Sequence, residues 1–132
     1  MKFLLPVALL ATVTAVPAFS DCAPPTISIT VPDGSKAAIA DMLAAQHAIK
    51  DADAVVQQFA DCLKTEQDAK VAAAGDSMKD EQKIKLATEY ADRQNEVADK
   101  LQKIADQFNV EVRAYKAMVA AAAAPAAQPA KP

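Results

Sequence analysis

Residues 87–119, ATEYADRQNEVADKLQKIADQFNVEVRAYKAMV, carry the pattern that decides the fold. Three rows of mostly apolar residues recur there at intervals of seven: Ala87, Gln94, Leu101, Phe108 and Tyr115; Tyr90, Val97, Ile104, Glu111 and Met118; and Ala91, Ala98, Ala105, Val112 and Val119. Side chains at this spacing share one face of an α-helix. The stripe is wider than the seam of a two-stranded coiled coil, so we expect this helix to contact more than one partner element.

A second helical pattern precedes this stretch. Its apolar residues recur at steps of three and four and include Ile39, Met42, Ile49, Val56, Phe59 and Leu63. Ser35 is suited to cap the start of this helix, Gly75 to end it, and Asp76 or Ser77 to cap the next one. The sequence therefore predicts a helical region over residues 35–122, with helices at about 35–74 and 77–122 and a turn near Gly75.

Two helices joined by a tight turn pack antiparallel. The implied register places Met42 opposite Phe108 and Ile49 opposite Leu101, so that apolar side chains face each other. The predicted fold class is all-α, a long antiparallel two-helix hairpin that resembles a coiled coil.

Residues 21–34 are rich in proline and cannot be helical. Within them Ile27, Ile29 and Val31 alternate with polar residues, which is typical of an extended chain with one apolar face. We expect this extended segment to lie in the groove between the helices, as the third element that the wide stripe needs. Fully extended, its 13 residues from Cys22 to Ser35 span about 43 Å, which just matches the roughly 40 Å of helix from Ser35 to Cys62.

The termini carry targeting and low-complexity signals. Residues 1–20 combine a basic start, an apolar run and a small-residue cleavage site before Asp21, which predicts a secretory signal peptide and a periplasmic or secreted protein. Residues 123–132 form an Ala/Pro tail that we expect to be disordered.

The net charge of −3 argues against binding to nucleic acid or to anionic lipid.

The chain has two cysteines, Cys22 and Cys62, both beyond the signal. In an exported protein the simplest interpretation is one disulfide that tethers the extended segment; free thiols or an intermolecular bond are the alternatives. Cys22 also lies near the new N-terminus, but Asp21 stands where a lipoprotein signal needs a small residue, which argues against lipidation. We therefore expect no stable membrane anchor after cleavage.

Candidate site residues are few. His47 and Asp51 share a helix face and could hold a metal, although a solvated pair is the simpler interpretation. We predict no metal, no cofactor and no enzymatic activity, because the sequence contains no recognisable catalytic or phosphate-binding motif.

Polar side chains at or beside the stripe offer two further hypotheses. A row of amides could supply hydrogen bonds to the isolated extended segment, or could simply face water: Asn95, Gln102 and Asn109. Four polar residues at seam positions fix register or sit at open edges, and a ligand groove is the alternative: Gln46, Asp53, Gln94 and Glu111.

Several short stretches resemble a family of small exported proteins of Gram-negative bacteria. They are Pro32-Asp33-Gly34, Met42 with Ala44-Ala45, Phe59-Ala60-Asp61-Cys62-Leu63, and the run Phe108–Lys116. The resemblance covers about residues 22–118, although Phe59 stands where tyrosine is expected. It implies a periplasmic location, a helical hairpin and a single disulfide, and it implies no activity.

These observations favour a non-enzymatic envelope protein that presents a helical hairpin to another, unknown envelope protein. The alternative is a periplasmic chaperone-like or apolar-ligand-binding protein that uses the groove between the helices. The sequence leaves the partner and the oligomeric state open.

Overall fold

The computed structural model describes residues 21–124, and the predicted signal peptide and most of the predicted Ala/Pro tail lie outside this range. The described chain contains α1 (Ile39–Ala74), a short 3₁₀ turn η1 (Gly75–Ser77) and α2 (Asp80–Ala123). It contains no β-strand, so the described part of the chain is all-helical as the sequence predicts. No described helix has both the length and the hydropathy needed to cross a membrane.

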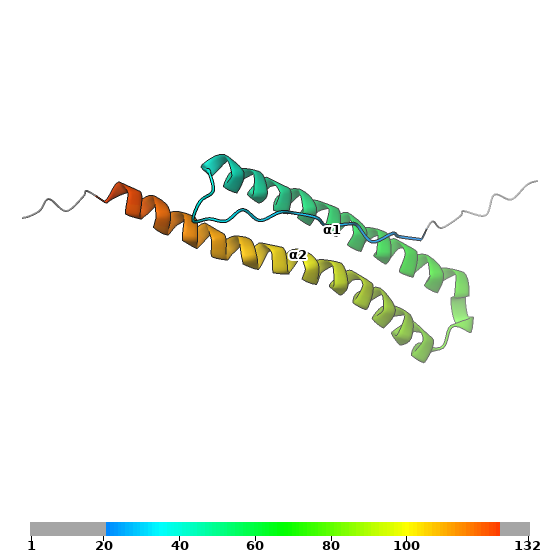
Figure 1. The fold of residues 1–132 in the computed structure, drawn as a ribbon. Coiled ribbons are helices and arrows are strands. Elements are labelled where there is room, and N and C mark those ends of the chain that lie inside the picture. Colours follow the sequence, from blue (N-terminus) through cyan, green and yellow to red (C-terminus); the bar gives the residue numbers. More distant parts are fainter. Residues whose placement is uncertain (1–20, 125–132) are drawn as a thin grey trace, which may run out of the picture.

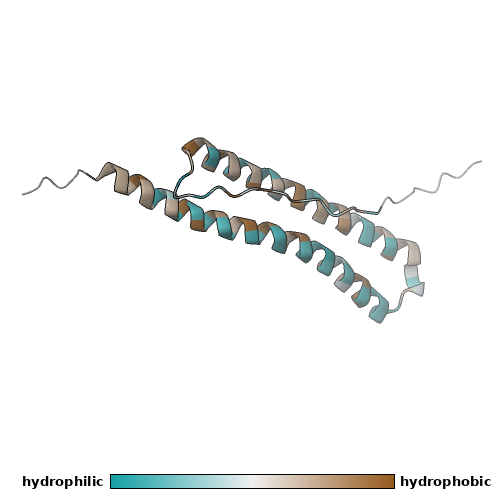
Figure 2. Cartoon of the chain, viewed as in Figure 1, coloured by the Kyte–Doolittle hydropathy of each residue, from teal (hydrophilic) through white to brown (hydrophobic). Residues whose placement is uncertain are grey.

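The two helices pack against each other along the described chain. Figure 1 shows them side by side, with η1 joining them at one end and the extended segment, residues 21–34, lying along them. Figure 2 shows that the half of α2 next to the turn is mostly hydrophilic, whereas hydrophobic residues recur along its other half.

Two clusters of buried residues form the core. The larger cluster comprises Cys22, Val56, Phe59, Leu63, Tyr90, Val97 and Leu101, and Ile27 and Ile29 of the extended segment pack against it. The smaller cluster comprises Met42, Ala45 and Phe108, with Val31 packed against it. The apolar face of the extended segment therefore belongs to the core. Burying a large apolar side chain contributes about 1.5–3 kcal/mol to stability.

The predicted cap at Ser35 is wrong. The Asp33 carboxylate accepts hydrogen bonds from both the N–H and the hydroxyl of Ser35, at 2.9 and 2.6 Å. The carbonyl of Asp33 accepts the N–H groups of Lys36 and Ala37, which closes a turn before the helix begins. α1 begins only after this turn, at Ile39, and Ala38 at its N-cap gives no side-chain bond.

The predicted cap of the second helix at Asp76 or Ser77 is also wrong. The Ser77 hydroxyl donates to the carbonyl of Ala74 and so satisfies the end of α1. The N-cap of α2 is Lys79, whose N–H donates to the side chain of Gln82 at 2.9 Å. Gly75, with φ of 52°, lies in the region that favours glycine and ends α1.

Candidate functional site

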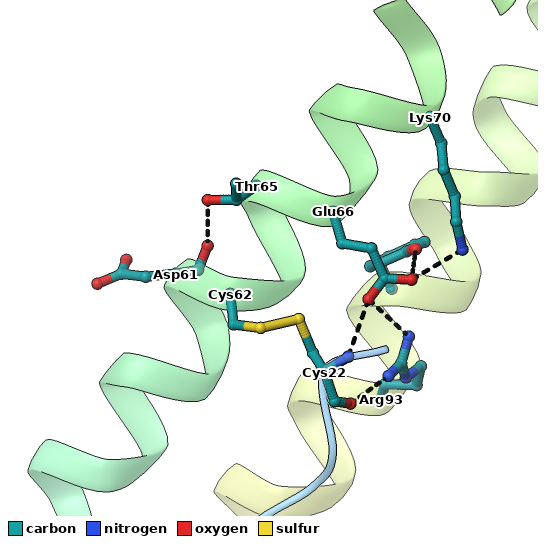
Figure 3. The surroundings of a disulfide bond; sticks show 8 residues. Cys22, Asp61, Cys62, Thr65, Glu66, Lys70 and Arg93 are labelled. Atoms are coloured by element: carbon teal, nitrogen blue, oxygen red, sulfur yellow. Dashed lines mark hydrogen bonds and ion pairs between the residues drawn. A yellow bond between two sulfur atoms is a disulfide. The ribbon is translucent and has the colours of Figure 1, made fainter. Parts of the chain in front are cut away.

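The most distinctive polar site of the described chain surrounds the disulfide. Cys22 and Cys62 form the predicted disulfide bond, with their Cα atoms 6.0 Å apart. Cys22 is buried, and it joins the extended segment to α1. Figure 3 shows charged side chains from both helices converging on Cys22.

Glu66 is the centre of this site and is only 4% exposed. Its Oε2 accepts the N–H of Cys22 at 3.2 Å, and its Oε1 accepts the Tyr90 hydroxyl at 2.6 Å and the Lys70 ammonium at 2.8 Å. The Arg93 guanidinium lies 3.9 Å from Oε2. We call these four side chains, Glu66, Lys70, Tyr90 and Arg93, the Glu66 cluster.

Local helix geometry brings the Glu66 cluster together. Glu66 follows Cys62 by four residues and Lys70 follows Glu66 by four, so all three lie on one face of α1. On α2, Tyr90 and Arg93 share a face in the same way. The Lys70 and Arg93 charges each lie 5.3 Å from the centroid of the Tyr90 ring, within the range of a cation–π contact.

The electrostatics of the cluster favour the charged states of Glu66 and Lys70. The Lys70 hydrogen bond, followed by the Tyr90 bond, lowers the pKa of Glu66 to about 2, against the opposing effect of burial. The bond to Glu66 in turn raises the pKa of Lys70 above its ordinary value. A buried carboxylate without partners would cost several kcal/mol, so these bonds are what allow Glu66 to be buried.

Arg93 and Glu66 together bind both main-chain polar groups of Cys22. The Arg93 Nη2 donates to the carbonyl oxygen of Cys22 at 2.6 Å, while Glu66 accepts the N–H. An extended chain without a neighbouring strand needs such partners for its buried main-chain groups.

The opposite end of the extended segment is fixed by a second carboxylate. Glu111 of α2 accepts the N–H of Gly34 through Oε2 at 2.8 Å. Gly34 is buried, and a Cβ at this position would lie 1.9 Å from the carbonyl oxygen of Glu111. The segment is therefore held at one end by α1 and α2 together and at the other by α2.

The amide row does not provide these bonds. Asn95, Gln102 and Asn109 are all exposed, and within residues 21–124 no hydrogen bond joins them to the extended segment. Gln102 instead donates to Asp106 on its own helix at 2.8 Å. The carboxylates of Glu66 and Glu111 and the guanidinium of Arg93 make these bonds instead, and hydrogen bonds to such charged groups are stronger than bonds to amides.

The other predicted site residues are placed as follows. His47 is exposed, and the described residues show no cluster of three or more metal-ligating side chains. Of the four polar seam residues, Glu111 anchors Gly34, while Gln46 is exposed on α1. Asp53 and Gln94 line a groove of about 440 Å³ between the helices, with Val56, Ala98 and Leu101 among its apolar residues.

Sequence reasoning did not identify Glu66, Lys70, Tyr90 or Arg93 as a site. A signal was present, because Glu66 lies one helical turn after Cys62 on the side where the tethered segment must arrive.

No protein-family model matches the chain, and neither the curated proteins nor the solved structures contain a match to it.

Proposed function

We propose that this chain is an exported, non-enzymatic protein of the cell envelope that presents a disulfide-tethered helical hairpin to another protein. The disulfide between Cys22 and Cys62 supports an oxidising compartment, where such bonds persist. The signal-like pattern of residues 1–20 and the resemblance to small exported proteins support the same location.

A structural role agrees with the chemistry of the buried charges. The Glu66 carboxylate is occupied by bonds to Cys22, Lys70 and Tyr90, and Glu111 is occupied by Gly34. A general acid or base needs a free position toward a substrate and a pKa near the working pH, whereas the pKa of Glu66 is about 2. These charges support a rigid hairpin, which suits a protein that displays a surface.

The observation that carries the proposal is an apolar hollow at the end of the hairpin opposite the turn. It measures about 240 Å³ and is lined mainly by apolar residues of both helices: Ile39, Met42, Leu43, Phe108, Val112 and Tyr115. Ile39 is 54% exposed and Leu43 is 47% exposed, although both are large aliphatic residues. We call this hollow the open-end surface. Exposed apolar side chains that gather around a hollow are typical of a protein-interaction site.

Cross-linking in intact cells tests this function. A photoreactive amino acid at Leu43 should give one dominant covalent product with a single envelope protein. The matched control places the same amino acid at Val55, which is similarly exposed at 43% but does not line the open-end surface. Equal cross-linking from both positions, or none from Leu43, would contradict the proposal.

The export step has its own test. Intact-mass measurement of the protein from the periplasm or medium should show Asp21 as the first residue and no lipid on Cys22. Retention of residues 1–20 would overturn the proposed location without affecting the proposed interaction surface.

A second candidate function rests on the groove between the helices. Its apolar lining by Val56, Ala98 and Leu101 and its volume of about 440 Å³ suit a chaperone-like or apolar-ligand-binding protein. A photoreactive amino acid at Ala98 distinguishes the two functions. Many different cross-linked proteins from Ala98 would favour the chaperone-like function, whereas one product from Leu43 alone favours the hairpin display.

A further inference from the structure

Both main-chain polar groups of Cys22 are bound, and the two bonds come from different helices. Glu66 of α1 accepts the N–H of Cys22 at 3.2 Å, and Arg93 of α2 donates to its carbonyl oxygen at 2.6 Å. Glu66 lies one helical turn after Cys62, on the same face of α1. The groups that hold Cys22 therefore place its side chain beside the cysteine with which it pairs.

None of these contacts depends on the bond between the two sulfur atoms. They join main-chain atoms to charged side chains, and Tyr90 and Lys70 hold the Glu66 carboxylate in place independently of either cysteine. Apolar contacts of Ile27 and Ile29, together with the bond from Gly34 to Glu111, also fix the rest of the segment. The segment thus has the contacts it needs to dock while both cysteines are thiols.

We infer that Glu66 and Arg93 are positioning residues for disulfide formation, because they dock Cys22 beside Cys62 before the bond closes. Glutathione disulfide can serve as the oxidant. One thiolate attacks it and releases one glutathione; the second cysteine thiolate then attacks the mixed disulfide and releases the other. Two thiols are oxidised, one glutathione disulfide is reduced to two glutathiones, and docking accelerates the second, intramolecular attack.

Limited proteolysis of a chain without the bond tests the docking directly. Cys22→Ser combined with Cys62→Ser keeps the N–H and carbonyl of residue 22, so the contacts with Glu66 and Arg93 can still form. A protease that cleaves beside apolar residues then attacks residues 26–31 only when the segment is undocked, and the cleavage rate follows the undocked population.

The expected result is slow cleavage in the segment of the serine variant. Adding Glu66→Gln and Arg93→Gln should speed this cleavage about ten-fold or more, since hydrogen bonds to charged groups are lost from the docked state. The matched control is Glu96→Gln, which removes only an exposed ion pair with Lys100. Cleavage of the serine variant as fast as a free peptide of the same sequence would overturn the inference. So would loss of its helical circular dichroism, because docking before closure requires folded helices.

A redox equilibrium with the unaltered cysteines provides the second readout. In glutathione buffers, the effective concentration of the Cys22–Cys62 pair should lie well above the millimolar value typical of a flexible loop. Glu66→Gln with Arg93→Gln should lower it toward that value. Val71→Ala, a change in a half-buried residue near the turn, should destabilise the helices but leave the redox equilibrium unchanged. If both changes shift the equilibrium equally, the two charged residues act only through general stability and the inference fails.

Discussion

Replacing Gly34 with alanine should destabilise the protein, although this change often has the opposite effect. The φ angle of Gly34 is not positive, so alanine can adopt its backbone conformation. Such a substitution stabilises by about 0.4–1 kcal/mol when nothing obstructs the new methyl group. Here the Cβ would lie 1.9 Å from the carbonyl oxygen and 2.7 Å from the carbonyl carbon of Glu111, and 2.9 Å from the N of Tyr115.

These obstructing atoms belong to the backbone of α2, so no flexible side chain can move aside. Forcing a methyl group into such a contact costs about 1–3 kcal/mol. Separation of the two backbones also weakens the bond from Gly34 to Glu111, and a hydrogen bond to a charged group contributes about 1.5–3 kcal/mol. The steric cost and the weakened bond exceed the entropic gain, and we expect a net loss of about 2–4 kcal/mol.

Urea unfolding of the oxidised protein measures this loss. With an m-value of about 2 kcal/mol per molar urea, the midpoint should fall by about 1–2 M. Thr30→Ala, at an exposed position of the same segment, is the matched control and should change stability by no more than about 0.5 kcal/mol. A midpoint for Gly34→Ala equal to or above that of the wild type would refute the close approach of the segment to α2.

Three further predictions concern the disulfide, the strand-like face of the segment and the Glu66 cluster. Reduction of the disulfide should lower the melting temperature by more than about 10 °C, since closing a loop of this length contributes roughly 4 kcal/mol and each kcal/mol shifts a small domain by about 4–8 °C. Calorimetry with and without reductant measures this shift, and an unchanged melting temperature would contradict the stabilisation expected from the disulfide. Ile29→Asp should lower the free energy of unfolding by several kcal/mol because Ile29 packs on the buried cluster, whereas Ser28→Asp should lower it by about 0.5 kcal/mol or less because Ser28 is exposed. Equal urea midpoints for the two variants would mean that the segment is not half-buried. The pKa of Glu66 is lowered from 4.5 to about 2, so its stabilising contribution is complete above about pH 4.5 and is lost as the pH falls toward 2. This contribution is at most about 3 kcal/mol, because Lys70 is half exposed and solvent screens its charge. Between pH 7 and pH 3, urea unfolding should therefore show a smaller loss of stability for Glu66→Gln than for the wild type. Identical losses would exclude a stabilising role for the Glu66 carboxylate.

The sequence contained enough to predict the all-helical fold and the disulfide pairing. The seven-residue rows of residues 87–119 depend only on helical periodicity, and a chain with two cysteines has only one possible intramolecular pairing. The structure also places Met42 and Phe108, which the predicted register pairs, in one buried cluster.

The polar anchors of the segment were harder to predict because they depend on three-dimensional proximity. Glu66 has the sequence neighbourhood of an ordinary exposed helix residue, with Lys70 four positions later, and only the arrival of Cys22 and Tyr90 makes it a buried acceptor. The capping errors have local causes, since the Ser35 hydroxyl donates to Asp33 and the Ser77 hydroxyl donates to the carbonyl of Ala74. The sequence places Glu111 on the apolar stripe as a polar residue, but its partner Gly34 is 77 positions away.

The disulfide also determines how the protein would transmit mechanical force. If the two ends of the described chain were pulled apart, tension entering at Cys22 would cross the sulfur bridge directly into α1 at Cys62. The residues between the cysteines, including the first half of α1, would carry no load. When fully stretched, the oxidised chain would be shorter than the reduced chain by about 140 Å. This difference is the extended length of the 40-residue separation that the disulfide bridges.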